Sequence, residues 1–178
     1  MHREKHVSTL QWSDDLALGV GAMDQTHIEF VDLLAEVQQA PDDTLLAKWE
    51  ELIDHTQVHF DNENRWMVET RFAAGNCHTT HHKAVLDVMR DGLRYGQQGH
   101  RNIVRQMAAE LTTWFPQHAD SMDAALAWHL KRVGYDPVSG SIAHPELLPG
   151  ELIHGCGGET CSDENVPAAD TAPTPASA

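Results

Sequence analysis

Apolar residues recur along most of this chain at the alternating three- and four-residue steps of amphipathic helices. The clearest run follows one face through residues 45–66: Leu45, Trp49, Leu52, Thr56, His59, Glu63 and Trp66. Three other segments show the same periodicity, at residues 24–40, from residue 78 to the glycines at 92, 96 and 99, and at residues 102–133. No stretch shows the two-residue alternation of a strand. The pattern therefore predicts an all-α protein.

Short connections join the four predicted helices. Asp24 suits the N-cap of the first helix, and Asp43 or Thr44, which follow Pro41, can cap the second. The fourth helix is predicted to face inward with Ile103, Met107, Leu111, Trp114, His118, Met122, Ala125 and Leu126. Amphipathic helices with short connections favour antiparallel neighbours, so we expect an up-down-up-down four-helix bundle over residues 22–133.

The segments on either side of this bundle lack helical periodicity. Residues 1–21 are predicted to form an irregular N-terminal arm, anchored by Trp12, Leu16, Leu18 and Val20. Residues 134–178 hold six of the chain's eight prolines, so we expect an acidic, Gly/Pro-rich and largely disordered C-terminal tail. The tail contains His144, His154, Cys156 and Cys161, which could bind a second metal, form a redox-switched disulfide or be unstructured.

The charge of the chain restricts its partners. The formal net charge of −15 argues against nucleic acid and anionic membrane surfaces. No apolar run approaches the roughly 20 residues needed to span a bilayer, and the charged start lacks a signal-peptide segment, so we expect a cytoplasmic protein. Three cysteines are too few for a disulfide scaffold and fit a reducing compartment, with Cys77 expected as a small buried thiol.

Histidine is unusually frequent, with thirteen residues against twelve Lys plus Arg, and it is the commonest metal ligand in proteins. Several candidate ligands fall on the predicted apolar faces, at least one from each helix: His27, His59, Glu63, His78, His82 and His118. A carboxylate buried there without a partner would cost several kcal/mol or would stay protonated. Metal coordination removes that cost, because a dication compensates the carboxylate.

A single histidine on such a face is more often a hydrogen-bonded core residue than a ligand. Convergence from all four helices argues for a metal site, and the set exceeds the four ligands of one zinc ion and suits two iron ions that share carboxylates. Spacing leaves two points open. His81 competes with His82, since it also lies one turn from His78. Asp123 follows His118 by five residues, which turns an α-helix by roughly 140°, so periodicity does not select it.

The same positions carry a resemblance to the bacterial hemerythrins. The run Trp12…Asp15…Leu18-Gly19-Val20…Asp24-Gln25-Thr26-His27 resembles their opening, and His59-Phe60-Asp61-Asn62-Glu63…Met67 resembles their His-Phe-x-x-Glu…Met motif. His78-Thr79-Thr80-His81-His82 resembles their His-x-x-x-His, and Trp114-Phe115-Pro116-Gln117-His118…Asp123 their Trp-Leu-x-x-His…Asp. The resemblance covers about residues 10–133, and the gaps between the motifs also fit.

The resemblance implies a di-iron centre with seven protein ligands. His78, His82 and His118 would hold one iron, and His27 and His59 would hold the other, which keeps an open position. Glu63 and Asp123 would bridge the two irons beside a bridging oxo or hydroxo group. The implied function is reversible dioxygen binding for storage, delivery or sensing, with Leu111, Phe60, Trp114, Phe115 and Met122 as candidate walls of the dioxygen pocket.

Three residues depart from the family pattern. Ala119 stands where a bulkier aliphatic residue is usual, Asn64 where a second acid is common, and Pro116 is expected to kink the helix before His118. A more accessible iron site beside Ala119 would favour the alternative function, a di-iron enzyme acting on peroxide, dioxygen or nitric oxide. A third hypothesis is a regulatory module that reports iron or oxygen occupancy to a partner, and an oxygen-using enzyme or reductase is a possible partner.

Overall fold

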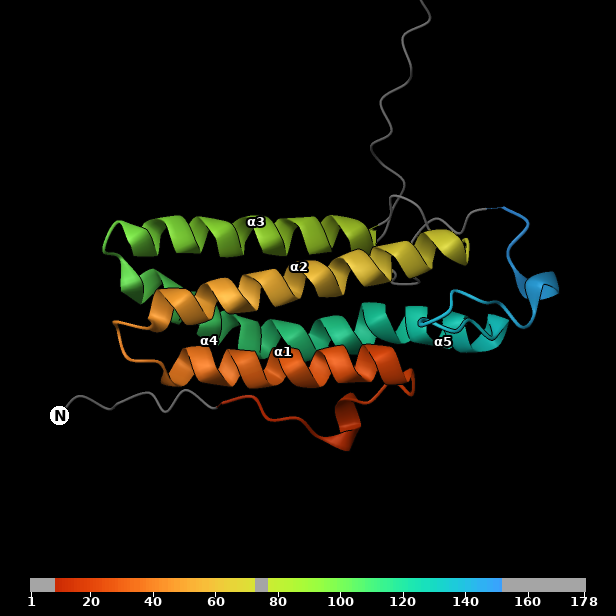
Figure 1. Ribbon diagram of the computed structural model, residues 1–178, viewed down its shortest axis with the longest axis horizontal. Coiled ribbons are helices and arrows are strands. Elements are labelled where there is room, and N and C mark those ends of the chain that lie inside the picture. The colour runs from red at the N-terminus through yellow and green to blue at the C-terminus, as the bar shows by residue number, and fades with distance from the viewer. Residues whose placement is uncertain (1–8, 73–76, 152–178) are drawn as a thin grey trace, which may run out of the picture.

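The computed structural model describes residues 9–72 and 77–151. Its main elements are α1 (Gly21–Gln39), α2 (Leu45–Glu69), α3 (Cys77–Gln97), α4 (Arg101–His118) and α5 (Ala124–Val133). A five-residue π-helical turn, Ala119–Asp123, joins α4 to α5, so that the two continue as one long rod (Figure 1). Short 3₁₀ helices lie at Asp14–Leu16 and Pro145–Leu147.

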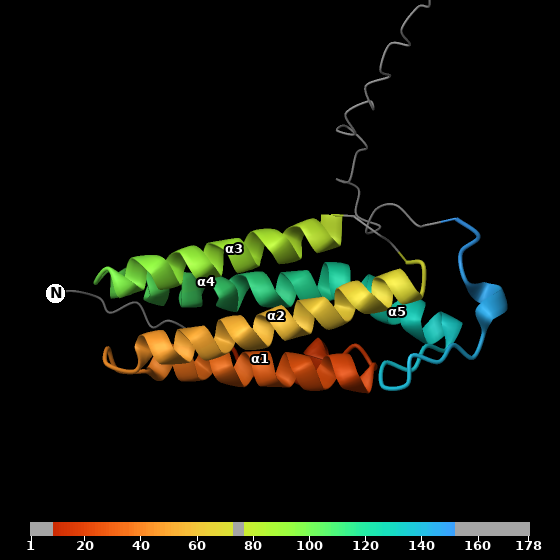
Figure 2. The ribbon, with the colours of Figure 1, turned by 45° about the horizontal axis from the view of Figure 1, so that its top comes forward.

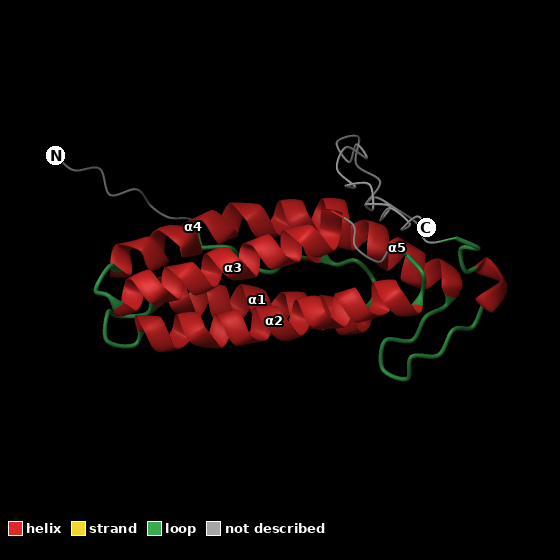
Figure 3. Ribbon diagram, turned by 90° about the horizontal axis from the view of Figure 1, so that it is seen from above, coloured by secondary structure: helices red, strands yellow, loops and turns green. Residues whose placement is uncertain are grey.

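The long helices lie side by side along a common axis (Figures 1 and 2). Each packs against the next in chain order, and α4 packs against α1, which closes the ring. The loops that join α1 to α2 and α3 to α4 lie at one end of the rods (Figure 3), whereas the chain before α1 runs alongside that helix (Figure 1). Within the described ranges there is no strand, only an isolated bridge between Tyr135 and Ile142, and no helix is long and apolar enough to cross a membrane. The predicted all-α four-helix bundle is confirmed.

Two apolar clusters fill the bundle, one toward each end. The first cluster contains Phe30, Val31, Leu34, Val37, Ala40, Leu45, Trp49, Leu52, Ile53, Met89, Val104, Ala108, Leu111 and Phe115. The second contains Val20, Met23, Trp66, Met67, Phe72, Leu126, Ala127, Leu130, Val133 and Tyr135. Along α1, α2 and the α4–α5 rod, the buried polar residues fall between the two clusters, except for His129, which lies beside the second cluster in α5. The core is therefore interrupted by a polar layer near the middle of the helices.

Helix α1 begins earlier than the sequence predicted. Its N-cap is Val20, whereas Asp24 lies in the first turn. The Asp24 carboxylate accepts hydrogen bonds from the backbone N–H groups of Leu18, at 2.6 Å, and Gly19, at 3.0 Å. Asp24 thus ties the arm to the helix and also lies at the positive end of the helix dipole. The expectation that Asp24 is the N-cap was wrong by one turn.

The α4–α5 rod contains one extra residue between the buried positions of α4 and those of α5, compared with the spacing of a regular α-helix. Its buried positions are Val104, Ala108, Leu111, Phe115, His118, Ala119, Asp123, Leu126, Ala127, His129, Leu130 and Val133. Removing one position after His118 restores the regular helical stripe, and the backbone N–H of Ala124 bonds to Ala119 five residues back. Met122 and Ala125, predicted inward, are only half-buried for this reason. Ile103, Met107 and Trp114 are also half-buried, because the true seam lies one residue further along.

Residues 134–151 differ from the flexible tail that the sequence suggested. Gly134, with φ of 62°, ends α5 in the left-handed conformation. Tyr135 is buried in the second cluster and donates a hydrogen bond from its hydroxyl to Glu69 on α2. The backbone N–H of His144 returns to Val133. Apolar contacts and hydrogen bonds therefore fold this segment back onto the end of the bundle. The motif with His154, Cys156 and Cys161 lies outside the described residues.

Candidate metal centre

The polar layer brings together all seven residues that the sequence singled out. His27 comes from α1, His59 and Glu63 from α2, His78 and His82 from α3, His118 from the end of α4, and Asp123 from the π turn. Each of them is buried. Their candidate ligand atoms form two overlapping groups that share the two carboxylates. The first group contains Glu63, His78, His82, His118 and Asp123, and the second contains His27, His59, Glu63 and Asp123.

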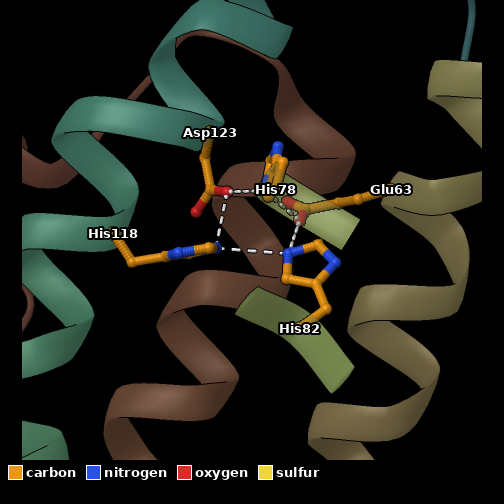
Figure 4. A group of neighbouring side chains, drawn as sticks. All are labelled: Glu63, His78, His82, His118 and Asp123. Carbon is orange, nitrogen blue, oxygen red and sulfur yellow. Dashed lines mark hydrogen bonds and ion pairs between the residues drawn. The ribbon is translucent and has the colours of Figure 1, made fainter. Parts of the chain in front are cut away.

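In the first group three imidazoles surround the two carboxylates (Figure 4). Asp123 Oδ1 lies 2.9 Å from His78 Nε2 and 3.2 Å from His118 Nε2. Glu63 Oε2 lies 3.3 Å from His82 Nε2 and 3.7 Å from His78 Nε2. The Nε2 atoms of His82 and His118 are 3.2 Å apart. Three ring nitrogens and two carboxylate oxygens therefore point toward a common volume.

The second group uses the other oxygen of each carboxylate. Glu63 Oε1 lies 3.1 Å from His59 Nε2 and 3.8 Å from His27 Nε2. Asp123 Oδ2 lies 3.4 Å from His27 Nε2. Each carboxylate therefore presents one oxygen to each group, which is the arrangement that a bridging carboxylate needs. The second group has two imidazoles where the first has three.

Helix geometry explains most of these positions. His59 and Glu63, like His78 and His82, are four residues apart and so lie on one face of their helix. Asp123 needs the π turn, because five α-helical residues would turn its side chain by roughly 140° from His118. With the extra residue absorbed by that turn, Asp123 returns to the face of His118. Single π turns are often found at functional sites in helices.

The donor set fits metal ions better than it fits internal hydrogen bonding. Buried polar groups normally have partners, yet Glu63 Oε2, both oxygens of Asp123 and both ring nitrogens of His27 and His78 have no hydrogen-bond partner. The close approaches between these atoms lack hydrogen-bond geometry, although His78 Nε2 is only 2.9 Å from Asp123 Oδ1. Buried imidazole and carboxylate groups converging in this way are typical ligands of transition metals.

The protonation states of the protein's own groups also suit a cation. Burial raises the pKa of the Glu63 and Asp123 carboxyls, but the facing histidines outweigh it and hold the pKa of both well below the ordinary value. Burial lowers the pKa of His27, but Asp123 and Glu63 outweigh it and raise that pKa to about 9. Burial lowers the pKa of His82 to about 4, so its ring is neutral near pH 7. Two ionised carboxylates thus lie in the core, and without a metal ion a protonated His27 balances only part of their charge.

Aromatic rings cover both groups. The Phe60 ring stacks on His82 with centroids 3.8 Å apart, and the Trp114 indole stacks on His118 at 4.5 Å. On the side of the second group, the Phe115 ring meets His27 edge-on at 5.1 Å and stacks on Phe30 at 4.5 Å. The surroundings of the candidate site are therefore largely apolar. Leu111 is buried in the first cluster, and Met122, the fifth predicted pocket wall, is half-buried.

An apolar cleft of about 470 Å³ opens between α3 and α4 near this site. Its inner wall includes Trp49, Met89 and Leu111, and Trp114 also lines it. Because the Trp114 indole also stacks on His118, a single ring touches both the cleft and the first group. The polar lining comes from three exposed residues, Glu110, Thr113 and Gln117.

The remaining histidines of the described helices take other roles. His81 is exposed, whereas its competitor His82 is buried with the other candidate ligands. His55 is half-buried, and its Nε2 bonds to the backbone oxygen of Thr26 at 3.1 Å, as expected for a polar residue outside the ligand set. His129 was not anticipated: it is buried in α5 and bonds through Nε2 to the oxygen of Thr70 at 2.9 Å.

Four residues beside the site differ from or add to the sequence expectations. Cys77 is disulfide-bonded, so the expectation of a free thiol was wrong. Pro116 lies inside α4, and the recorded change of helix type follows His118 rather than preceding it. Ala119 is buried next to His118. Asn64, which the sequence showed only as a departure from the family pattern, accepts a hydrogen bond from His82. Its position directly after Glu63 was the sequence signal for this contact.

Comparison with known proteins agrees with this geometry. Residues 18–127 match the family described as the hemerythrin HHE cation binding domain. A bacteriohemerythrin of Ralstonia nicotianae is 36% identical over 130 residues, which cover 73% of this chain and 95% of that protein. A bacteriohemerythrin of Pseudomonas paraeruginosa is 27% identical over 122 residues, which cover 66% of this chain and 79% of that protein. A bacteriohemerythrin of Stenotrophomonas maltophilia is 26% identical over 130 residues, which cover 70% of this chain and 84% of that protein.

No solved structure matched the chain at a significant level. The family match nevertheless spans most of the bundle and six of the seven candidate ligands lie on its four long helices, with Asp123 in the π turn that continues them. The buried cluster of histidines and carboxylates is of the kind that suits a metal site, and iron is the metal typical of this family. The chain belongs to the hemerythrin family.

Proposed function

We propose that this protein holds two iron ions and reversibly binds dioxygen, for storage, delivery or sensing. The observation that carries the proposal is the division of oxygens within each carboxylate. Glu63 directs Oε1 to His59 and Oε2 to His82, while Asp123 directs Oδ2 to His27 and Oδ1 to His78. Two carboxylates divided in this way are suited to bridge two ions, and a single ion would leave half of the donors unused.

The histidines make the two ions unequal. His78, His82 and His118 would hold one ion, which with both bridges has five protein donors, and His27 and His59 would hold the other, which has four. Iron with nitrogen and carboxylate ligands commonly takes six donors, and a bridging oxo or hydroxo group would add one to each ion. An ion held by His27 and His59 would therefore keep an open position for a small ligand. Iron supplies the electrons that reversible dioxygen binding requires.

The protein's part in this function is to orient the ligands and to exclude water. Phe115 and Phe30 cover the His27 side, where the open position would lie. Apolar surroundings slow the loss of charged oxygen species and strengthen local electrostatic interactions. The buried, ionised carboxylates Glu63 and Asp123 would balance the charge of the ions.

Gas exchange with the reduced, iron-loaded protein tests the proposal. On exposure to air the protein should take up one dioxygen per iron pair and gain visible charge-transfer absorption. Both changes should reverse under vacuum or argon over repeated cycles. The replacements His59→Ala and His82→Ala, one from each group, should each lower the iron content. Iron-loaded protein with no reversible uptake of dioxygen would contradict the proposal.

The alternative is a di-iron enzyme that acts on peroxide, dioxygen or nitric oxide at the same site. The buried Ala119 is the observation that favours it, because a methyl group beside His118 leaves more room near the site than a larger aliphatic side chain would. Under this alternative the air-induced absorption decays promptly, and added peroxide or nitric oxide is consumed with turnover. Ala119→Ile should then slow the decay and the consumption.

A further inference from the structure

The five imidazoles of the site are not held in the same way. Nδ1 is the ring nitrogen that faces away from the two groups, since every close contact with Glu63 or Asp123 uses Nε2. In four of the rings Nδ1 is buried without a hydrogen-bond partner: His27, His59, His78 and His118. His82 is the exception within the described residues, because its Nδ1 lies 3.1 Å from Asn64 Oδ1.

The chemistry of the amide oxygen determines the state of the ring. Asn64 Oδ1 can only accept a hydrogen bond, so Nδ1 of His82 carries the proton and donates it. In a neutral imidazole the other nitrogen, Nε2, then presents its lone pair. That lone pair points toward Glu63 Oε2 and His118 Nε2, 3.3 and 3.2 Å away, inside the first group. Asn64 thus selects the tautomer that can bind a metal.

Phe60 completes the restraint on the ring. It lies parallel to His82, with an interplanar angle of 4° and centroids 3.8 Å apart, so it limits tilting of the imidazole. The Asn64 hydrogen bond limits rotation within the ring plane. Asn64 follows Glu63 directly on α2, so one turn of one helix supplies both a candidate bridging ligand and the group that orients a second ligand.

We propose that Asn64 is the positioning residue of this site, which fixes the tautomer and orientation of His82 and, as a neutral acceptor, limits the electron donation of that imidazole to the metal. The proposal rests on the proposed function, because it assumes that His82 is a ligand. Partners of this kind typically change metal affinity by 10- to 100-fold when removed. A carboxylate acceptor would withdraw the Nδ1 proton more strongly and make the ring a stronger donor.

The surroundings of Asn64 allow this test, because two cationic side chains line the pocket beside its amide. A small pocket of about 170 Å³ between α2 and α3 borders the hydrogen bond. The pocket is lined by Gln57, Phe60, Asn64, Thr79, His82, Lys83, Leu86 and Arg90, with two cations and no acid among them. Asp at position 64 keeps the shape of the side chain and lies beside the pocket that Lys83 and Arg90 line, although Lys83 already pairs with Asp87. Leu keeps the size and removes the acceptor.

The experiment compares Asn64→Leu and Asn64→Asp with the matched replacements Asn62→Leu and Asn62→Asp. Asn62 lies on the same helix and pairs with Arg65 rather than with a histidine. Three properties are measured: iron loss to a competing chelator, the reduction potential of the iron-loaded protein, and the His82 tautomer by ¹⁵N NMR of the metal-free chain. We expect Asn64→Leu to lose iron about 10- to 100-fold more readily and to lose the dominant Nδ1–H tautomer. Asn64→Asp should retain iron and lower the reduction potential, and the Asn62 variants should match the wild type.

Two results would overturn the proposal. One is an Nε2–H tautomer for His82 in the wild-type chain, which needs no iron to be seen. The other is Asn64→Leu with wild-type iron retention and reduction potential, even if its thermal stability falls, because a structural role alone would move only the stability. Failure of the wild type to bind two irons would refute the proposed function instead, and the tautomer measurement keeps the two failures apart.

Discussion

Deletion of Ser121 from the π turn is expected to leave the fold and the metal site in place. The turn holds one residue more than the buried stripe on either side of it needs, and Ser121 is exposed, with its hydroxyl bonded only to the backbone oxygen of Gln117. Without Ser121, Asp123 would follow His118 by four residues. Four α-helical residues turn the side chain by roughly 40° from the starting face, whereas five turn it by roughly 140°.

The deletion should also preserve the packing of α5. Leu126, Ala127, Leu130 and Val133 would fall seven, eight, eleven and fourteen residues after His118, which are the core positions of a regular helix. The rod would shorten by about 1.5 Å. Since the lost hydrogen bond is exposed, the free energy of unfolding should change by less than about 1 kcal/mol.

Deletion of Thr113, which is exposed in the regular part of α4, is the matched control. It turns the following residues by about 100° relative to the preceding ones and displaces Phe115 and His118 from the core, at a cost of at least about 3 kcal/mol. Urea unfolding and iron content per chain are measured for both variants. If the two deletions destabilise the protein equally and both abolish iron binding, the account of the π turn as an absorbed extra residue is wrong.

Three further outcomes are expected. Gly96→Ala should destabilise the protein by about 1–3 kcal/mol in urea unfolding, since the added Cβ would lie 2.5 Å from Leu46 Cδ2 and 3.0 Å from Val104 Cγ2. A variant that is more stable than the wild type would show that the helices have room to separate. Burial lowers the pKa of His129 below its ordinary value, so its contribution to stability should be lost as pH falls below about 6.5, by at most about 1.4 kcal/mol per pH unit. In metal-free protein His129→Gln should therefore flatten the fall in unfolding free energy between about pH 7 and pH 5, and an unchanged slope would contradict this role. Iron loading should raise the unfolding temperature and the gain should vanish on chelation, whereas equal melting of both forms would argue against a site built in the folded state.

The helical periodicity was sufficient to predict the bundle and to place six candidate ligands in its core. His59 and Glu63 could be found because both lie on the clearest apolar face in the chain, where an ionised carboxylate without a partner would be costly. Asp123 could not be found in this way, because α-helical geometry turns it away from His118. Only the family resemblance included it, and the π turn supplies the physical reason. The same extra residue explains why Met122 was wrongly predicted to face inward.

Other differences arise from contacts that a local pattern does not encode. Asp24 looked like an N-cap, yet its carboxylate binds the backbone of the arm that precedes the helix. Residues 134–151 have the composition of a flexible tail, yet Tyr135 enters the second cluster and reaches Glu69 on another helix. His129 has no partner close in sequence, since its hydrogen bond reaches Thr70 at the end of α2. Each of these depends on residues brought together only by the tertiary fold.

In the proposed function two iron ions share Glu63 and Asp123. Titration of the metal-free chain with Fe(II) under argon, with bound iron and dioxygen uptake measured at each ratio, tests this sharing. We predict saturation at two irons per chain and dioxygen uptake that appears only as the second iron binds, at one dioxygen per pair. Saturation at one iron per chain, or dioxygen uptake that is complete at one iron, would contradict the account.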